Sequence, residues 1–419
     1  MMNFEELLKD KPCSCGMTHT CAIKHIVVGK GANQQLGALM GEYRRVVLCA
    51  DENTYAACGA EVEAQLGDRL QAKLVYHRDG LVIPNEEAVA ELDALITPDT
   101  DLIVGVGSGV IQDICKYVSF NARLPYYIVA TAPSMDGYAS VGAAMIMGGM
   151  KVTYFAHVPE VIIGDIDVLK DAPMDMIQSV YGDILGKYSC LNDWTLAKVV
   201  RGEYFCQYVY DLTFDMLLKT RDLGPALLQR DPDAIQTLME AIVGVGVAMA
   251  FVGNSRPASG SEHHLSHFFE IVGILNDEPY FMHGTDVVYS SVYTERVREQ
   301  LLALPAPARR ALPSREAWEA DIRATYTTIA DSVIALQDKM GWYGEDRFPV
   351  YAEKWEDICA VLREAPSSKD MLGYVESVGL NAAEFYESYG REKIARALKY
   401  GKDLKDRFSV LWLYYDLLA

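Results

Sequence analysis

The chain has 419 residues, of which 50% are hydrophobic and 23% are charged, as expected of a soluble protein that buries a core in about two domains. Its net charge of −20 argues against binding to nucleic acid, because phosphate contacts need clustered Lys and Arg, and against anionic membrane surfaces. A small anionic substrate is compatible with this charge, since a few local cations or a helix N-terminus suffice to bind it.

The N-terminal stretch KPCSCGMTHTC contains Cys13, Cys15, His19 and Cys21. All four could bind a soft metal, but C-x-C-x₃-H-x-C is not a familiar zinc spacing. We therefore predict a reduced arm on the solvent side and leave these residues out of the predicted metal site. The odd total of nine cysteines argues against a disulfide framework, and the N-terminus lacks the features of a signal peptide. Both observations predict a reducing, cytoplasmic environment.

Up to about residue 165, short apolar runs rich in Val and Ile alternate with helical stretches such as 31–43 and 85–97. Continuous apolar runs of this kind are typical of strands that are buried on both faces of a parallel sheet. The alternation predicts an open α/β dinucleotide-binding domain over residues 1–167, with a ligand crevice at the carboxyl ends of the strands. The predicted strands are 25–29, 45–50, 73–77, 102–107, 126–132 and 160–166.

From residue 168 onward the pattern changes to long stretches with helical periodicity, which predicts an all-helical domain over 168–419. The longest apolar run, 241–253, is too short to span a bilayer and is predicted to be a buried helix, so no membrane insertion is expected. The predicted helical stretches are 173–200, 204–221, 232–253, 260–274, 284–303, 315–340, 349–364, 380–398 and 402–418.

A glycine-rich turn follows the fourth predicted strand, in LIVGVGSGVIQD. Gly105, Gly107 and Gly109 would let backbone N–H groups approach a pyrophosphate at a helix N-terminus. The spacing is G-x-G-x-G rather than the Rossmann G-x-G-x-x-G, so a tight turn without a ligand is the alternative. Asp51, at the end of an earlier strand, is expected either to bind an adenosine ribose or to cap the following helix.

The loop ATAPSMDGYAS, 130–140, follows the next predicted strand and carries Thr131, Ser134, Asp136 and Ser140. A polar loop after a buried strand lies where α/β domains bind their ligands. A loop whose polar groups serve only as caps is the alternative.

The stretch SGSEHHLSHFFE, 259–270, holds three of the eight histidines of the chain. Helical periodicity places His263 and His267 together, opposite an apolar stripe, with His264 between the two faces. With His283, a pair four residues apart favours a metal site over a structural histidine. Imidazoles suit Zn²⁺, Ni²⁺ or Fe²⁺, and a catalytic site takes three protein ligands. The third ligand is expected to be Asp183, with Asp193 as the rival.

These motifs together resemble one superfamily, which comprises the iron-dependent alcohol dehydrogenases, glycerol dehydrogenases and dehydroquinate synthases. The motifs are GVGSGVIQD, TAPSMDGYAS, GDILGK with NDW, SRPASGSEHHLSH and HG, in this order. SMDGYAS and SRPASGSEH most resemble sn-glycerol-1-phosphate dehydrogenases of the bacterial AraM type, as does the tail LKDRFSVLWLYYDLL. The resemblance covers roughly residues 20–418, and it implies a dehydroquinate synthase-like fold.

The resemblance also implies roles for individual residues. Asp183, His263 and His283 would bind the metal, while His267 and Asp136 would contact the substrate. Asp at position 183 matches the dehydrogenases, whereas a dehydroquinate synthase would have Glu, which makes a lyase less expected. The implied dinucleotide-binding residues are Asp51, Gly105, Val106, Gly107, Ser108, Gly109, Thr131, Ser134 and Ser140.

The implied reaction is the reversible reduction of dihydroxyacetone phosphate by NAD(P)H to sn-glycerol 1-phosphate. The implied role of this product is in phospholipid biosynthesis. The expected metal is zinc or nickel, with iron as a further option. Asp51 favours NAD over NADP, because an acid at this position suits a free ribose hydroxyl. Arg256 and Lys187 are candidates for phosphate binding, with structural ion pairs as the alternative. A homo-oligomer, preferably a dimer, is expected. The alternative activity is that of a glycerol or other small-polyol dehydrogenase.

Overall fold

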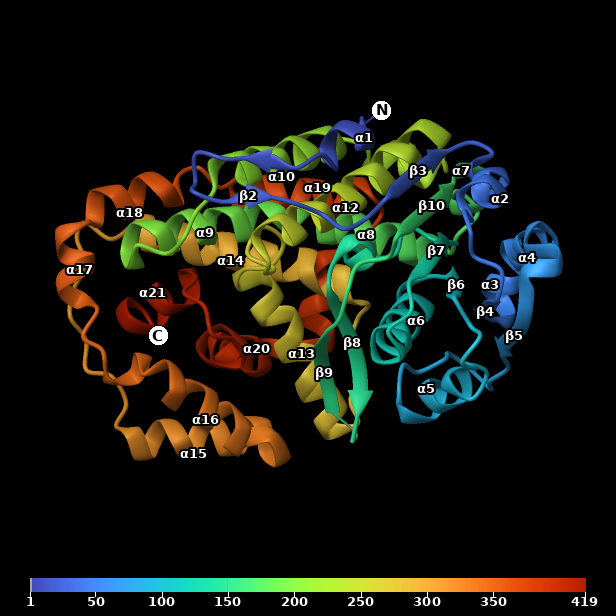
Figure 1. Cartoon of the computed structure of the whole chain (residues 1–419). Coiled ribbons are helices and arrows are strands. Elements are labelled where there is room, and N and C mark those ends of the chain that lie inside the picture. The colour runs from blue at the N-terminus through green and yellow to red at the C-terminus, as the bar shows by residue number, and fades with distance from the viewer. Residues whose placement is uncertain (1, 149) are drawn as a thin grey trace. The chain divides into compact units, whose positions relative to one another are not determined.

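The computed structural model describes residues 2–148 and 150–419. The chain forms two compact units (Figure 1). The first comprises residues 1–180 and 225–254, and the second comprises 181–224 and 255–419. The sequence predicted a boundary at 167/168. The compact units differ from that prediction chiefly because helix α12, Pro232–Val252, packs against α7, Ile166–Leu169, and the turn Asp136–Ala139 of the first unit.

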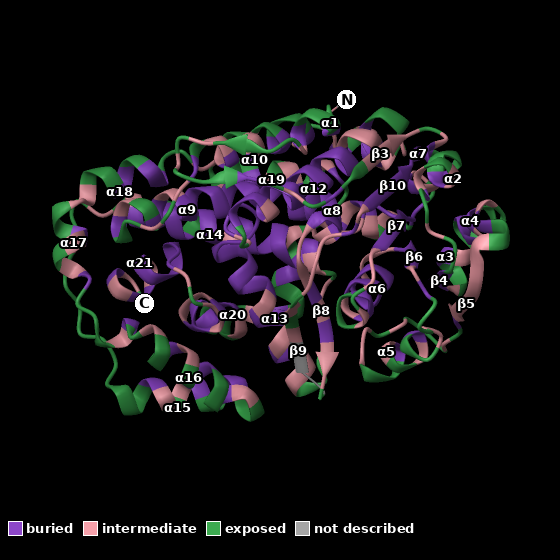
Figure 2. Cartoon of the chain, viewed as in Figure 1, coloured by how far each residue is buried: buried purple, intermediate pink, exposed green. Residues whose placement is uncertain are grey.

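The first unit is built on a six-stranded sheet in the order β3-β10-β7-β6-β4-β5, and every neighbouring pair in it is parallel. All six predicted strands are members of this sheet. The four inner strands β10, β7, β6 and β4 are buried on both faces, as Figure 2 shows for β7 and β10, whereas the edge strands β3 and β5 are mostly half-buried. The strands are β3 His25–Gly29, β4 Val46–Asp51, β5 Leu70–Tyr76, β6 Leu102–Gly107, β7 Tyr126–Ala130 and β10 Val161–Asp165.

Helices cover both faces of this sheet. On one face, α2 Leu36–Leu39 and α4 Ala60–Leu66 pack against side chains such as Leu48 and Val104. On the other face, α5 Glu86–Asp93 and α6 Gly109–Ala122 pack against Val47 and Ile103. This double-sided cover is what a parallel sheet needs, and it confirms the predicted α/β architecture.

Two short hairpins of the first unit were not predicted. β1 Lys11–Pro12 pairs with β2 Thr18–His19, and β8 Gly142–Met147 pairs with β9 Met150–Phe155. Both are antiparallel and short, so their periodicity in the sequence is weak.

Helix α12 contains the apolar run that was predicted to be a buried helix. The helix has 21 residues, in agreement with the predicted stretch 232–253, and is longer than the apolar run within it. By length and composition it could cross a membrane, but 83% of its most apolar window is buried. It is the core helix of the first unit.

The second unit is helical, as predicted. Three predicted stretches are divided into two α-helices each: 173–200 becomes α8 and α9, which are separated at Gly186, 315–340 becomes α15 and α16, and 349–364 becomes α17 Phe348–Glu353 and α18. Trp342, Phe408 and Trp412 lie in its aromatic core. Its principal helices are α8 Met174–Leu185 (which begins in the first unit), α9 Lys187–Arg201, α10 Gln207–Thr220, α13 Ser261–Asn276, α14 His283–Leu302, α15 Arg315–Tyr326, α16 Ala330–Met340, α18 Trp355–Leu362, α19 Ser368–Ser377, α20 Ala382–Tyr400 and α21 Val410–Leu417.

Candidate functional site

Three residues of the second unit form one candidate metal-binding group. Asp183 on α8, His263 on α13 and His283 at the start of α14 each offer a ligand atom, and these atoms lie within 4.8 Å of one another. Asp183 and His263 are buried, and His283 is half-buried. Two donors on a tetrahedral ion at ordinary ligand distances lie roughly 3.3–3.4 Å apart. The separation of 3.4 Å between Nε2 of His263 and Oδ1 of Asp183 fits that value.

Close packing between α8 and α14 brings Asp183 to His283. A side chain at Gly182 would come within 2.5 Å of the carbonyl oxygen of Gly284. One turn later, a side chain at Gly186 would come within 2.6 Å of Val287. Gly182 in α8 and Gly186 directly after it therefore both allow the approach of α14. Gly182, which precedes Asp183 in YGDILG, is therefore needed for the helix packing that brings the metal-binding group together.

Glu262 orients the imidazole of His263. Its Oε1 lies 2.6 Å from Nδ1 of His263 and also accepts the backbone N–H of Gly260 at 2.8 Å. A carboxylate takes the proton-bearing nitrogen, so Nε2 of His263 is left to face Asp183 as a ligand. Burial lowers the pKa of His263, but hydrogen bonds to Asp183 and Glu262 outweigh it and raise the pKa above its ordinary value.

Lys187 holds the carboxylate of Asp183 in its charged form. Its Nζ donates to Oδ1 of Asp183 at 2.9 Å and to the carbonyl of Ala258 at 3.0 Å. Burial opposes the charge on Asp183, but Lys187, His263 and His283 lower its pKa far below the ordinary range. An ionised carboxylate and two imidazoles are a donor set that suits a divalent transition metal.

Both basic residues considered for phosphate binding take part in ion pairs within the second unit. Lys187 pairs with Asp183, and Arg256 pairs with Glu203 and donates to the carbonyl of Phe408 at 2.8 Å. For both side chains, the structure therefore shows the internal ion pair that the sequence analysis gave as the alternative to phosphate binding.

His264 and His267 have different environments on α13. The ring centroid of His267 lies 6.0 Å from that of His263 and 5.4 Å from that of His283, so His267 adjoins the metal-binding group. His264 is completely buried, and its two ring nitrogens lack hydrogen-bond partners among the described residues. Burial, together with nearby cations such as Arg407, lowers the pKa of His264 well below its ordinary value, so this ring is neutral.

Asp193, the rival candidate for the third metal ligand, links parts of the second unit by hydrogen bonds. Its Oδ1 accepts from Arg298 at 3.1 Å and from the backbone N–H of Val410 at 2.8 Å, and its Oδ2 accepts from the backbone N–H of Ser261 at 2.6 Å. It therefore joins the first turns of α13 and α21 to a buried arginine. The ligand group of the structure contains Asp183 and not Asp193.

The glycine-rich turn of the first unit joins β6 to α6, with Ser108 as the N-cap residue of α6. Side chains at Gly105 and Gly107 would come within 2.9 Å of Cys115 and 2.5 Å of Ile111. Both glycines are thus needed for the packing of strand on helix. Gly109 lies at the start of α6 and donates its N–H to Oγ of Ser134 at 3.2 Å. Val106 is buried in the core below this turn.

Asp51 caps the helix that follows β4. Its Oδ1 accepts the backbone N–H groups of Asn53 and Thr54, both at 2.9 Å. The N-cap alternative is therefore observed, and ribose binding by the same carboxylate remains a prediction.

The loop after β7 is organised by side chains of α6. Thr131 is buried beside Gly107, and Ser140 closes a short turn with Gly137. Lys116 is fully buried and donates to the carbonyls of Gly137 and Gly142 at 3.1 and 2.7 Å. Asp136 begins the short helix Asp136–Ala139 inside this loop and is half-buried.

Two supporting residues escaped the sequence analysis, Glu262 and Lys116. A weak signal existed for Glu262, since an acid next to a predicted ligand histidine is a common orienting partner. Lys116 follows Asp113 by three residues on a predicted helix, and nothing in that pattern indicates complete burial.

Comparisons with known proteins place this chain in a family. The model of the iron-containing alcohol dehydrogenase family matches residues 27–173. A protein of Geobacillus thermodenitrificans named glycerol-1-phosphate dehydrogenase (NAD(P)+) is 32% identical over 413 residues, which cover 96% of this chain and 95% of that protein. The chain belongs to the glycerol-1-phosphate dehydrogenase family. A relative of the same name from Geobacillus stearothermophilus is 35% identical and covers 67% of this chain and 71% of its own length.

This family membership confirms the resemblance inferred from the sequence motifs. The crystal structure of a probable glycerol dehydrogenase from Sinorhizobium meliloti aligns with a TM-score of 0.59 at 15% identity and covers 91% of this chain and 89% of that chain. Likeness at this identity concerns the fold alone, and it confirms the predicted α/β part followed by an all-helical part.

Proposed function

We propose that the protein catalyses the reversible NAD(P)-dependent reduction of dihydroxyacetone phosphate to sn-glycerol 1-phosphate with the help of a divalent metal. The observation that carries the proposal is the group formed by Asp183, His263 and His283 in a chain of this family. The donor distances, the burial and the ionised carboxylate all suit a catalytic ion with an open coordination position.

The residues of the second unit have separate tasks in this reaction. Asp183, His263 and His283 would hold the ion, and Glu262 and Lys187 would fix the orientation and charge of these ligands. When bound, the ion would polarise the substrate oxygen at the reacting carbon and the nicotinamide would exchange hydride with that carbon. His267, one helical turn from His263, would hydrogen-bond a substrate hydroxyl or phosphate, or relay a proton at its ring nitrogen.

The cofactor would lie on the glycine-rich turn and the loop after β7. Gly107, Ser108 and Gly109 present the N-terminus of α6, where backbone N–H groups attract a pyrophosphate. We propose NAD as the preferred cofactor because Asp51 suits a free ribose hydroxyl. The other proposed contacts are Gly105, Val106, Thr131, Ser134 and Ser140 for the cofactor and Asp136 for the substrate.

Several finer points belong to the same proposal. Zinc or nickel is the proposed metal, with iron as the alternative, because all three accept one carboxylate and two imidazoles. We also propose a cytoplasmic homodimer. A dehydrogenase of unphosphorylated glycerol is the second candidate, since Lys187 and Arg256 are both engaged in internal ion pairs.

One set of assays tests both candidates. The metal-free protein is loaded separately with Zn²⁺, Ni²⁺ or anaerobic Fe²⁺, and the oxidation of NADH and NADPH is followed with dihydroxyacetone phosphate and with dihydroxyacetone. We expect kcat/KM to be higher for the phosphorylated ketone, and we expect Asp183→Asn to abolish turnover. Turnover with the unphosphorylated ketone alone would contradict the phosphate-containing substrate. Failure with every metal would contradict the assignment to this class of enzyme.

A further inference from the structure

The N-terminal segment of the chain contacts helix α12 at two places, and both belong to the first unit. The backbone N–H of Met2 donates to Oε2 of Glu240 at 2.7 Å. Further along the segment, Nδ1 of His19 lies 2.9 Å from the carbonyl oxygen of Phe251, near the carboxyl end of α12. These two contacts hold the segment against its own unit.

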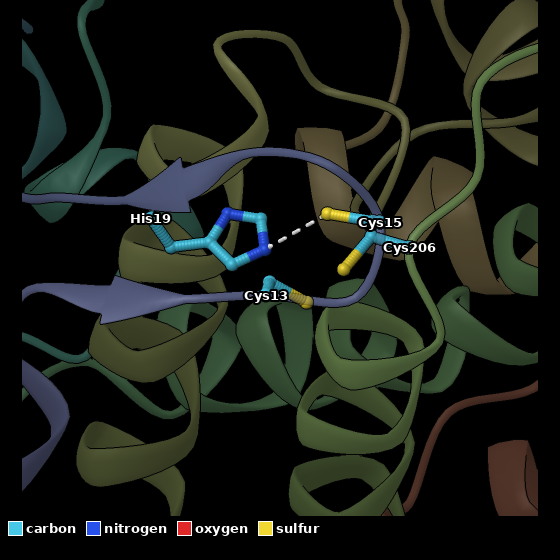
Figure 3. A group of neighbouring side chains, drawn as sticks. All are labelled: Cys13, Cys15, His19 and Cys206. Carbon is cyan, nitrogen blue, oxygen red and sulfur yellow. Dashed lines mark hydrogen bonds between the residues drawn. The ribbon is translucent and has the colours of Figure 1, made fainter.

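Between the two contacts, a hairpin brings soft donor atoms together. β1 pairs with β2, and the backbone N–H of Cys13 donates to the carbonyl of Met17 at 2.9 Å. Gly16 completes the turn with a φ of 92°, a left-handed conformation that favours glycine. Sγ of Cys15 thereby comes to 3.5 Å from Nε2 of His19, and Figure 3 shows these two side chains facing each other.

His19 is oriented with its Nε2 toward the thiols. A carbonyl only accepts hydrogen bonds, so Nδ1 carries the proton beside Phe251, and Nε2 of the neutral ring has a lone pair. The ring also packs against that of Phe251, with 5.4 Å between centroids. Orientation by a backbone carbonyl is a usual outer support of a metal-bound histidine. The prediction of a solvent-side arm is wrong for His19, which is completely buried.

The separations between these donor atoms suit a tetrahedral zinc ion. A thiolate at about 2.3 Å and an imidazole at about 2.0–2.1 Å from such an ion lie roughly 3.5–3.6 Å apart, and Cys15 and His19 are 3.5 Å apart. The ligand atoms of Cys13, Cys15 and His19 all lie within 4.8 Å of one another. A thiol–imidazole hydrogen bond would account for the first distance, but it does not account for the convergence of a second thiol on the same point.

We propose that Cys13, Cys15 and His19 bind a divalent metal ion of the zinc class at a site within the first unit. Two thiolates and a neutral imidazole balance the charge of a divalent ion, which suits a site with half-buried and buried ligands. The three donors leave one position of a tetrahedral ion for a further ligand. Each cysteine releases its thiol proton to water on binding, so metal affinity should fall as the pH is lowered. The proposal does not depend on the proposed dehydrogenase function.

The ion would fasten the hairpin to its unit. β1 and β2 have two residues each, and an isolated two-stranded hairpin is at best marginally stable in water. The ion would join the turn to His19, and the hydrogen bond from His19 to Phe251 would join it to α12. Hydrogen–deuterium exchange in residues 11–19 should therefore quicken when the ion is removed, while exchange in β6 and β7 should not change. Equal exchange in residues 11–19 with and without the ion would contradict this role.

Cobalt substitution tests the site in the whole protein. The metal-free chain is titrated with Co²⁺, and the thiolate-to-cobalt charge-transfer absorption in the near ultraviolet is recorded. The Asp183 group contains no sulfur, so Co²⁺ bound there does not contribute. We expect one Co²⁺ per chain to produce the absorption, with Zn²⁺ displacing it and His283→Ala leaving it unchanged. Absence of the absorption in the Co²⁺-loaded wild-type protein would overturn the proposal and would leave only a thiol–imidazole hydrogen bond.

Serine variants identify the ligands. Removal of an outer partner of a metal site lowers affinity roughly 10- to 100-fold, and loss of a ligand should cost at least as much. Cys13→Ser and Cys15→Ser should therefore each weaken Co²⁺ binding by at least about tenfold and lower the charge-transfer intensity. Cys21→Ser, in the same segment but outside the ligand group, is the matched control and should retain the wild-type affinity and spectrum. Wild-type affinity in either of the first two variants would overturn the site.

Discussion

At the scale of single residues, α13 assigns different environments to three neighbouring histidines. His263 lies in the ligand group, His267 adjoins it, and His264 is buried and neutral on another side of the helix. The difference follows from the angle of about 100° between successive residues of an α-helix. Glu262 adds a carboxylate that fixes which nitrogen of His263 faces Asp183. Small angular steps thus separate a predicted ligand, a predicted substrate contact and a core residue.

We expect His267→Ala to lower kcat/KM while the metal stays bound. Loss of a hydrogen bond to a charged or reacting group costs about 1.5–3 kcal/mol, which corresponds to a fall of roughly 10- to 100-fold. Steady-state kinetics and elemental analysis of the same preparation measure both quantities. His77→Ala, which removes an exposed histidine of the first unit, is the control. Full activity of His267→Ala with bound metal would contradict the proposed substrate contact.

At the scale of elements, the junction of β6 and α6 combines packing with a helix N-terminus. Gly107 ends the strand, Ser108 occupies the N-cap position of the helix, and Ile111 fills the space in which a side chain at position 107 would lie. The same glycine that the sequence suggested for a phosphate loop is therefore required by the first unit itself. Cofactor binding at this turn is a separate prediction, and a substitution distinguishes the two roles.

We expect Gly107→Ala to destabilise the protein by about 1–3 kcal/mol, because the added methyl overpacks the contact with Ile111. Urea unfolding measures this effect, and the KM for NAD measured on the folded variant reports the cofactor role. In Gly37→Ala, the added methyl meets no atom within 4 Å, so this control should change stability by less than about 1 kcal/mol. Equal stabilities of the two variants would contradict the packing argument.

At the scale of the whole molecule, the second unit buries a network of charges next to the helix that carries His263. Arg298 on α14 donates to Asp193, to Glu295 at 2.9 Å and to Asn192 at 2.9 Å. Burial raises the pKa of Glu295 to about 8, against the attraction of Arg298 and with the help of Asp193 and Glu262. The folded protein therefore keeps a proton on Glu295 that the unfolded chain releases near its ordinary pKa of 4.5.

This difference predicts a pH-dependent stability. Between the unfolded pKa of 4.5 and the folded pKa of about 8, the folded state binds more protons, so the contribution of Glu295 to stability falls as the pH rises. We expect the Tm of the wild type relative to that of Glu295→Gln to decrease from pH 5 to pH 8, as measured by calorimetry. Glu299→Gln, one turn further along the exposed side of α14, is the control. A Tm difference that is constant with pH would refute the protonated carboxyl.

The sequence by itself determined the elements whose pattern is local. Apolar runs rich in Val and Ile specified the six parallel strands, most clearly the four inner ones, which are buried on both faces, and helical periodicity specified the second unit. Periodicity also placed His263 and His267 on one side of α13. The sequence motifs indicated the family, and the similar proteins confirm it.

Only the tertiary structure decided which residues that are remote in sequence meet. It placed Asp183 rather than Asp193 with His263 and His283, and it engaged Lys187 and Arg256 in ion pairs. The physical reason is that ligand sets depend on distances between elements, such as the approach of α14 that Gly182 permits, and spacing along the chain does not contain these distances.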